Sequence, residues 1–387
     1  MMRLNFNKRQ WGPIGLELDS DCIRMVQLCE SRDDLVLSSA YEQKQDIESD
    51  DPALSFRLTL RRMLEEYGLH GRRVVVGLPA HYLHVTTVRI TELDFQRGLE
   101  EAARQAAWRL GWDPELHRIE AIPAGRIRSK DQAKIEILLM AVKNQDIAEL
   151  LNSLDQCDIE VVGLDPLPCA VFRNARRCME REGGSNELTA FVHVGRKTTQ
   201  VIFGQQGDIS FIKQVPLGTE NFVRDITQKL DIEWAQAELL RTKIYQEQLD
   251  SVDGLGQETI VLDRSIRQAI LDTELLVAEE LCKELSLCLR YYTVTFRGQR
   301  VQQVLFSGGK GDEMVLQNHI SQSMHVPVKP VDPFIGLRPS VEIHESSPLD
   351  DSRPWAVPMG LALKGWDWKE RLCQTEAVIP TTPVTPF

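Results

Sequence analysis

The residues best placed for ligand chemistry follow a short apolar run late in the chain. Val304-Leu305-Phe306 precede Ser307-Gly308-Gly309-Lys310, and a helical pattern follows over residues 312–324. Three apolar residues predict a buried strand, and paired glycines let the backbone turn tightly or approach a ligand. The free N–H groups of a helix start could then receive a phosphate or a ribose. On these residues alone, a plain helix entry with Lys310 in solvent is the favoured interpretation.

Few other residues have the spacing of an active site. His81 and His84 lie three apart in an extended segment, so their side chains point to opposite faces and do not predict a metal pair. The eight cysteines include no C-x-x-C pair, which favours buried reduced thiols over disulfides or metal. No nucleophile elbow or other hydrolase spacing occurs. We therefore expect no catalytic residue and no metal site from these patterns.

Composition and charge narrow the class of protein. The chain has 387 residues, of which 42% are hydrophobic and 26% charged, as expected of a soluble globular protein of two to three domains. Its formal charge of −12 opposes binding to nucleic acid. No apolar stretch approaches the roughly 18 residues of a spanning helix, and residues 1–10 carry charge where a signal peptide is apolar. We expect a cytoplasmic chain that does not itself span a membrane.

Two segments of the chain open in the same way. Apolar residues recur over residues 14–28 around the polar turn Asp19-Ser20-Asp21, which predicts a β-hairpin, and a buried strand follows at 74–76. Residues 188–215 repeat this layout, with strands expected at 188–194, 199–203 and 209–215. The repetition predicts an internal duplication.

The remaining patterns divide the chain into domains. A half-buried strand is expected over residues 83–90, and one long helix over residues 266–296, with a break near Thr293 as an alternative. Alternating strands and helices predict the α/β class. The predicted parts are a first subdomain at 12–80 and 156–182, an inserted small α+β subdomain at 81–155, a second subdomain at 188–230 and 300–366, a helical subdomain at 231–299, and a disordered Pro/Thr-rich tail at 367–387.

Short motifs occur in a characteristic order along the chain. They are Gly15 to Leu28, Val74 to Pro79, Gly163-Leu164-Asp165-Pro166, His193-Val194-Gly195, Val215-Pro216-Leu217-Gly218, Ser307-Gly308-Gly309, Asp332-Pro333-Phe334 and Gly360 to Leu363. In this order they resemble the PilM family of type IV pilus assembly proteins, cytoplasmic members of the actin-like ATPase superfamily. The resemblance covers roughly residues 12–365. It implies two actin-like domains of the ribonuclease H type, with a small α+β insert in the first.

The resemblance also implies a site for ATP and Mg²⁺, from which this chain departs. Glu17 and His193 stand where the family has aspartates that position the metal, and Asp19 replaces a loop glycine. A carboxylate about 4 Å from a phosphate charge costs on the order of 4 kcal/mol at an effective dielectric of about 20. Unless the Arg24 charge offsets this cost, we expect poor binding of ATP, and we expect no hydrolysis. The residues that the resemblance assigns to the nucleotide are Glu17, Ser20, Arg24, Gly195, Thr198, Gly308 and Gly309.

In the PilM family, a groove beside the insert grips the short cytoplasmic N-terminal peptide of an inner-membrane partner, PilN. The residues of this chain that the resemblance suggests for such a groove are Leu83, Val85, Val88 and Ile90, with an ordinary core role as the alternative for each. The resulting expectation is a non-catalytic scaffold of pilus, secretion or competence machinery, held at the inner membrane by its partner and open to self-association. The alternatives are an active actin-like ATPase or small-molecule kinase, and an actin-like cell-division or shape protein.

Overall fold

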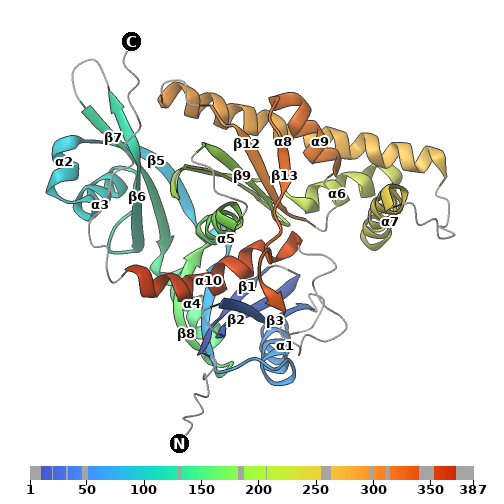
Figure 1. Ribbon diagram of the computed structural model, residues 1–387, viewed down its shortest axis with the longest axis horizontal. Coiled ribbons are helices and arrows are strands. Elements are labelled where there is room, and N and C mark those ends of the chain that lie inside the picture. The colour runs from blue at the N-terminus through green and yellow to red at the C-terminus, as the bar shows by residue number, and fades with distance from the viewer. Residues whose placement is uncertain are drawn as a thin grey trace, which may run out of the picture. The chain divides into compact units, whose positions relative to one another are not determined.

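The computed structural model forms two compact units. It describes residues 10–19, 21–31, 34–45, 51–128, 133–181, 187–205, 207–253, 263–296, 300–309, 314–339 and 353–371. The first unit comprises Met1–Asn186, Gly204–Ile212 and Val331–Phe387, and the second comprises Glu187–Phe203 and Lys213–Pro330. None of the described helices is long and apolar enough to cross a membrane. Figure 1 shows the elements in chain order by colour.

A six-stranded sheet forms the centre of the first unit. Its strands are β1 (Gln10–Leu18), β2 (Cys22–Ser31), β3 (Asp34–Lys44), β4 (Arg73–Leu78), β8 (Glu160–Pro166) and β14 (Arg338–Pro339), in the order β14-β3-β2-β1-β4-β8. The antiparallel pairing of β1 with β2 confirms the predicted hairpin. β3 is not among the predicted strands. It buries Ser38 and Ser39 beside its apolar residues, a composition that carries little hydrophobic signal.

Three helices accompany this sheet: α1 (Pro52–Glu66), α5 (Leu167–Arg181) and α10 (Ala356–Arg371). α10 packs closely on α5 and β1 through glycines. A Cβ atom on Gly360 would lie 1.9 Å from the carbonyl oxygen of Ala170, and one on Gly15 would lie 2.2 Å from that of Pro358. These contacts correct the prediction that residues 331–366 belong to the second subdomain, because small residues bind α10 to the first unit. α10 also continues to Arg371, past the predicted domain end at 366, whereas residues 372–387 of the predicted tail lie outside the described residues.

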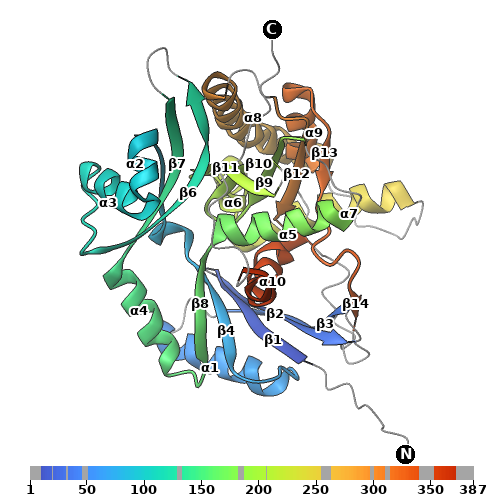
Figure 2. The same ribbon diagram turned by 60° about the vertical axis from the view of Figure 1, so that its left-hand side comes forward.

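The region after β4 contains a separate three-stranded sheet. It consists of β5 (His84–Thr91), β6 (His117–Arg128) and β7 (Ala133–Lys143) in the order β5-β7-β6, with antiparallel pairing throughout. The short helices α2 (Glu92–Arg97) and α3 (Leu99–Arg109) cover one face, and η1 (Ala80–Tyr82) and α4 (Asn144–Asp155) flank the segment (Figure 2). α3 approaches the sheet closely because its buried side chains are alanines: Ala102, Ala103, Ala106 and Ala107.

A five-stranded sheet lies mainly in the second unit. Its strands are β9 (Thr189–Val194), β10 (Thr199–Gln205), β11 (Asp208–Val215), β12 (Gln303–Gly308) and β13 (Val328–Pro330), in the order β11-β10-β9-β12-β13. The helices are α6 (Thr219–Leu230), α7 (Trp234–Asp253), α8 (Arg264–Thr295) and α9 (Met314–Met324). α8 buries residues of every turn from Ile270 to Thr295 and shows no break at Thr293, so that alternative is wrong.

The two large sheets have the same layout. In each sheet, three strands that are consecutive in the chain lie side by side. The first of these three also neighbours a later strand, and a second later strand lies beyond that one. The order β3-β2-β1-β4-β8 thus corresponds to β11-β10-β9-β12-β13. β4 runs parallel to β1, and β12 runs parallel to β9. The repeated layout predicted from the sequence is present in both sheets.

Candidate functional site

The first hairpin holds one arginine between three carboxylates. The Arg24 Nη1 atom lies 3.3 Å from Oε2 of Glu17 and 3.9 Å from Oδ2 of Asp19, and its Nε atom lies 2.6 Å from Oε2 of Glu42. The side chains of Arg24 and Glu17 are only 10% and 9% exposed. The Glu17 carboxylate on β1 therefore forms a buried ion pair with Arg24 on the neighbouring strand β2.

Burial changes the protonation of Glu17. Loss of hydration raises the pKa of its carboxyl from 4.5 to about 7, and the Arg24 charge opposes this rise without cancelling it. A carboxyl with this pKa is incompletely ionised at neutral pH. A metal ligand must give up its proton, so Glu17 is a weaker metal ligand than an exposed aspartate would be.

The turn of this hairpin contains a small group of potential metal ligands. Ligand atoms of Asp19, Asp21 and Cys22 lie within 4.8 Å of one another. The Cys22 side chain is buried, and burial raises the pKa of its thiol well above the ordinary range. The Asp19 N–H donates to the Cys22 carbonyl at 3.0 Å, so this turn amide is already engaged. The group therefore lacks an ionised thiolate ligand, and the Asp19 amide is not available to a phosphate.

The corresponding strand end of the five-stranded sheet carries a histidine. His193 on β9 and Ser307 on β12 are cross-strand partners, and the His193 Nδ1 and Ser307 Oγ atoms lie 3.0 Å apart in the buried interior. In the turn that follows, the Gly195 N–H donates to the Thr198 carbonyl at 3.0 Å. The resemblance expects a carboxylate and a phosphate-binding turn here. This chain instead has the His193 imidazole hydrogen-bonded to the Ser307 hydroxyl, and a turn in which the Gly195 N–H is already bonded to Thr198.

The paired glycines after β12 have a packing role. Gly308 has a φ of 86°, and a Cβ atom on it would lie 2.2 Å from the carbonyl oxygen of Val194. Gly309 has a φ of 66°, and its N–H donates to that same carbonyl at 2.9 Å. Only glycine fits this left-handed, close approach of β12 to β9. The glycines are therefore explained by strand packing, whether or not they also face a nucleotide.

The structure groups the predicted nucleotide residues within each unit. Glu17 and Arg24 are adjacent in the first unit, whereas Gly195 and Thr198 share one turn, and Gly308 and Gly309 share another, in the second. Ser20 and Lys310 lie outside the described residues. The family pattern requires two available metal-positioning carboxylates. Glu17 is committed to Arg24, and the second position is His193, so these residues do not fit Mg²⁺ with a triphosphate.

A hollow of about 250 Å³ lies beside the insert's sheet, between β5 and α3. Its apolar lining is Val88 and Ile90 from β5 with Ala102, Ala106 and Leu110 from α3 and its C-cap. β5 is an edge strand, and no described strand pairs with its outer edge. The structure thus brings two of the four predicted groove residues to a hollow at an open sheet edge.

The other two predicted groove residues do not line this hollow. Leu83 is buried, and Val85 is half-buried along β5. Conversely, Gln105, Arg109 and Leu110 line the hollow and were not predicted. The alanine face of α3 was the signal that could have indicated this wall, because small side chains let a helix pack close to a sheet.

The rim of the hollow is polar, and two of its side chains are held by an ion pair and a hydrogen bond. Arg89 pairs with the buried Glu136 at 3.1 Å, which holds the arginine along β5. The Thr91 hydroxyl donates to the Asp94 carboxylate at 2.7 Å, which fixes the start of α2. The floor and rim therefore combine apolar surface with side chains capable of hydrogen bonding.

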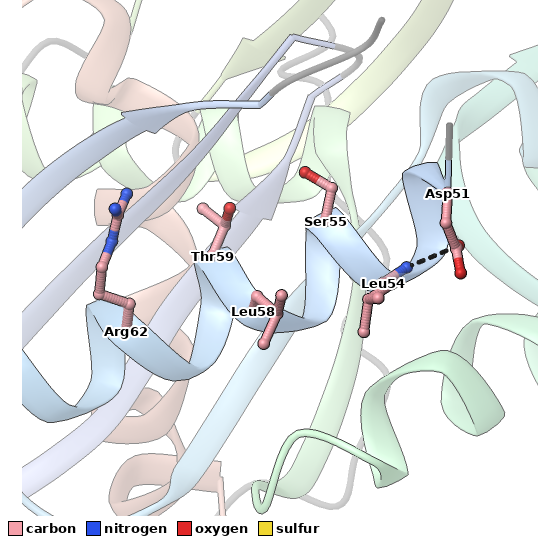
Figure 3. A pocket seen from close by; sticks show the side chains of 6 residues that line it. All are labelled: Asp51, Leu54, Ser55, Leu58, Thr59 and Arg62. Carbon is pink, nitrogen blue, oxygen red and sulfur yellow. Dashed lines mark hydrogen bonds between the residues drawn. The ribbon is translucent and has the colours of Figure 1, made fainter. Parts of the chain in front are cut away.

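A second surface hollow runs along α1. Asp51, the N-cap residue, accepts a 2.9 Å hydrogen bond from the Leu54 N–H, and Leu54 and Leu58 are 44% and 57% exposed (Figure 3). All of the described lining residues belong to α1 and its N-cap: Asp51, Leu54, Ser55, Leu58, Thr59 and Arg62. This stripe is opposite to the helix face that buries Leu60 and Leu64.

Comparisons with known proteins identify the fold. The family described as type IV pilus assembly protein PilM matches residues 265–366. A structure titled PilM-PilN type IV pilus biogenesis complex is 18% identical, with a TM-score of 0.73, and the match covers 92% of this chain and 98% of that one. The ethanolamine utilization protein EutJ from Carboxydothermus hydrogenoformans is 13% identical, with a TM-score of 0.51 and coverage of 91% and 89%. A comparison with curated protein sequences gives no match.

Proposed function

From the PilM-like, actin-like ATPase fold of this chain, we propose that it is a scaffold protein of a type IV pilus or a related secretion or competence machinery. In this proposal, the hollow between β5 and α3 holds the cytoplasmic N-terminal segment of a PilN-like inner-membrane protein. The chain itself remains on the cytoplasmic side, is held at the membrane by that partner and does not hydrolyse ATP. The observation that carries the proposal is an apolar hollow at an open sheet edge.

An edge strand can supply the backbone hydrogen bonds that hold an extended peptide. The outward N–H and C=O groups of β5 can pair with a peptide backbone, as in recognition by strand addition. An extended peptide also needs a surface that receives every second one of its side chains. Val88 and Ile90 lie on the face of β5 that packs against Ala102 and Ala106.

Leu110 adds apolar surface at the end of the hollow, where its side chain is 45% exposed. The polar rim supplied by Gln105 and Arg109 can bond to the backbone of a bound segment.

The hollow along α1 is a weaker place for this peptide. Its described lining comes from one helix and its N-cap, so it presents no strand edge for backbone pairing. An extended segment bound there would leave its own backbone groups to water. The comparison between the two hollows gives a direct experiment.

The experiment measures binding of a synthetic peptide with the cytoplasmic N-terminal sequence of the PilN-like partner. Leu110→Glu places a charge on the exposed end of the β5–α3 hollow and is expected to weaken binding about tenfold or more, roughly 1.4 kcal/mol or more. Leu58→Glu is the matched control, because Leu58 is also a largely exposed leucine, 57% against 45% for Leu110, and it lines the α1 hollow. It should leave the affinity unchanged.

Hydrogen exchange supplies an independent readout. Strand addition should slow the exchange of alternate β5 amides when the peptide is bound, since those amides then donate to the peptide backbone. If Leu58→Glu abolished binding and Leu110→Glu did not, the assignment to the insert would be wrong. Unchanged exchange along β5 in a complex that does form would exclude strand addition.

A further inference from the structure

The hairpin of β1 and β2 contains its own cation. We propose that Arg24 takes the place that the actin-like fold gives to Mg²⁺ in this hairpin, which makes the hairpin a closed ion cluster that admits neither divalent metal nor phosphate. This proposal does not depend on the peptide groove, because the hairpin residues are separate from those of the insert.

The strand register places Arg24 at the centre of a row of charges. On β2, Arg24 is the cross-strand partner of Glu17 on β1 and also of Glu42 on β3. The three side chains therefore lie side by side on one face of the sheet. Both flanking carboxylates lie within ion-pair distance of the guanidinium, at 3.3 Å for Glu17 and 2.6 Å for Glu42.

The carboxylates that a metal ion would need as ligands already interact with the Arg24 guanidinium. A divalent ion bound between Glu17 and Asp19 would have to sit next to a fixed positive charge, because Asp19 lies 3.9 Å from the same Nη1 atom. The bulky, 10%-exposed Arg24 side chain has little freedom to withdraw. The Arg24 charge thus offsets part of the negative charge of the three carboxylates from within the hairpin, at the place where a bound cation would otherwise do so.

Phosphate is disfavoured by the same arrangement. Arg24 is the positive group of the hairpin, and two of its nitrogens, Nε and Nη1, already donate to Glu42 and Glu17. The carboxylates around it repel an approaching anion. In the second unit, His193 pairs with Ser307, so that position does not supply a carboxylate for a metal either.

The test uses the full chain and Mn²⁺ as the probe. Wild-type protein is expected to show no saturable Mn²⁺ binding by calorimetry and no change of Tm with millimolar Mn²⁺. Arg24→Gln removes the internal cation and leaves the carboxylates of Glu17, Asp19 and Glu42 together. This variant should melt at a lower temperature without metal, and Mn²⁺ at about ten times its Kd should raise its Tm by about 3 °C.

Two further variants separate this outcome from a simple loss of stability. Arg241→Gln is the buried control, because Arg241 is 6% exposed and pairs with Glu274 at 2.7 Å. It should lower Tm without creating a response to Mn²⁺. Arg24→Lys keeps the positive charge and should remain insensitive to Mn²⁺, as the wild-type protein does.

The proposal has clear contrary outcomes. It is wrong if the wild-type chain binds Mn²⁺ at the hairpin, if folded Arg24→Gln gains no Mn²⁺ binding, or if Arg24→Lys gains as much as a neutral variant. Should Arg24→Gln not fold without metal, refolding with and without Mn²⁺ replaces the melting experiment. Recovery only with Mn²⁺ supports the proposal, and no recovery together with metal binding by Arg24→Lys contradicts it.

Discussion

At the scale of single residues, buried charges hold the first unit together. Asp165 ends β8 with its side chain 3% exposed, and it accepts a 2.7 Å hydrogen bond from Arg173 on α5. Lys364 on α10 donates to the same carboxylate. One carboxylate therefore joins a strand and two helices. The motif that resembles a family turn has a structural function in this chain.

Replacing Asp165 with asparagine should be costly, because the buried carboxylate would be lost and two partly buried cations, Arg173 and Lys364, would lose their counter-ion. Breaking a buried ion pair typically costs about 3 kcal/mol or more of unfolding free energy. Urea denaturation of Asp165→Asn should show a loss of this size. Glu120→Gln, which breaks the exposed pair with Arg118, should cost less than about 1 kcal/mol. Equal losses in the two variants would contradict the structural role of Asp165.

Glu17 should make stability depend on pH in an unusual direction. Its pKa is about 7 in the folded chain, against an ordinary 4.5, so the folded state keeps a proton that the unfolded chain releases between these values. The stabilisation is complete below pH 4.5 and is lost as pH rises through 7. At about 1.4 kcal/mol per pKa unit, the total is about 3 kcal/mol.

The comparison of wild-type protein with Glu17→Gln isolates this contribution. Unfolding free energies measured from pH 5 to pH 8 should fall in the wild-type protein relative to the variant. Other carboxylates titrate equally in both proteins and cancel in the difference. Parallel curves across this range would show that Glu17 has an ordinary pKa.

At the scale of elements, the close crossing of α5 and α10 depends on a glycine, which has no side chain. Gly360 lets α10 approach the backbone of α5 at Ala170. α10 also reaches β1, where Gly15 meets Pro358. The first unit is thus built by helices and a strand that touch through their backbones, which leaves no room for a methyl group.

Gly360→Ala tests this packing. Alanine favours a helix over glycine by about 1 kcal/mol, but a Cβ atom 1.9 Å from a backbone oxygen forces the helices apart. We expect the clash to dominate, with a net loss of about 2 kcal/mol in thermal or urea unfolding. Gly163→Ala is the control, because its nearest neighbour would be 4.0 Å away. A variant Gly360→Ala as stable as the wild-type protein would refute the close crossing.

At the scale of the whole molecule, the two sheets of the same layout carry different residues at the two positions that the resemblance assigns to the metal. The first sheet has Glu17 paired with Arg24, and the second has His193 paired with Ser307. A conserved fold and altered chemistry therefore coexist in one chain. The part of the proposal that excludes ATP hydrolysis rests on these two pairs, whereas the peptide site rests on the hollow between β5 and α3.

The chain should release no phosphate from ATP above background in a coupled assay with Mg²⁺, because phosphoryl transfer depends on the metal clamp that these residues do not form. Calorimetry with ATP and Mg²⁺ should likewise show no micromolar binding. Phosphate release that disappears in Glu17→Gln would instead support the actin-like ATPase or kinase alternative.

Much of the fold could be predicted because its signals are local. The apolar alternation of β1 and β2, the buried run of β12 and the periodicity of α8 each follow from neighbouring residues in the chain. The order of short motifs indicated the actin-like fold for the same reason. The sequence also has Glu17 and His193 at the two positions where the resemblance to the PilM family predicts aspartates.

Only the tertiary structure decided what those residues contact. β3 places Glu42 beside Arg24, α3 supplies the second wall of the β5 hollow, and α10 returns to the first unit. Each of these results depends on residues far apart in the chain, and local periodicity carries no information about such pairings. Local patterns in the sequence predicted most of the elements. Long-range strand register and backbone-to-backbone packing decided that Arg24 lies among carboxylates and that only glycine fits at Gly308, next to the Val194 carbonyl.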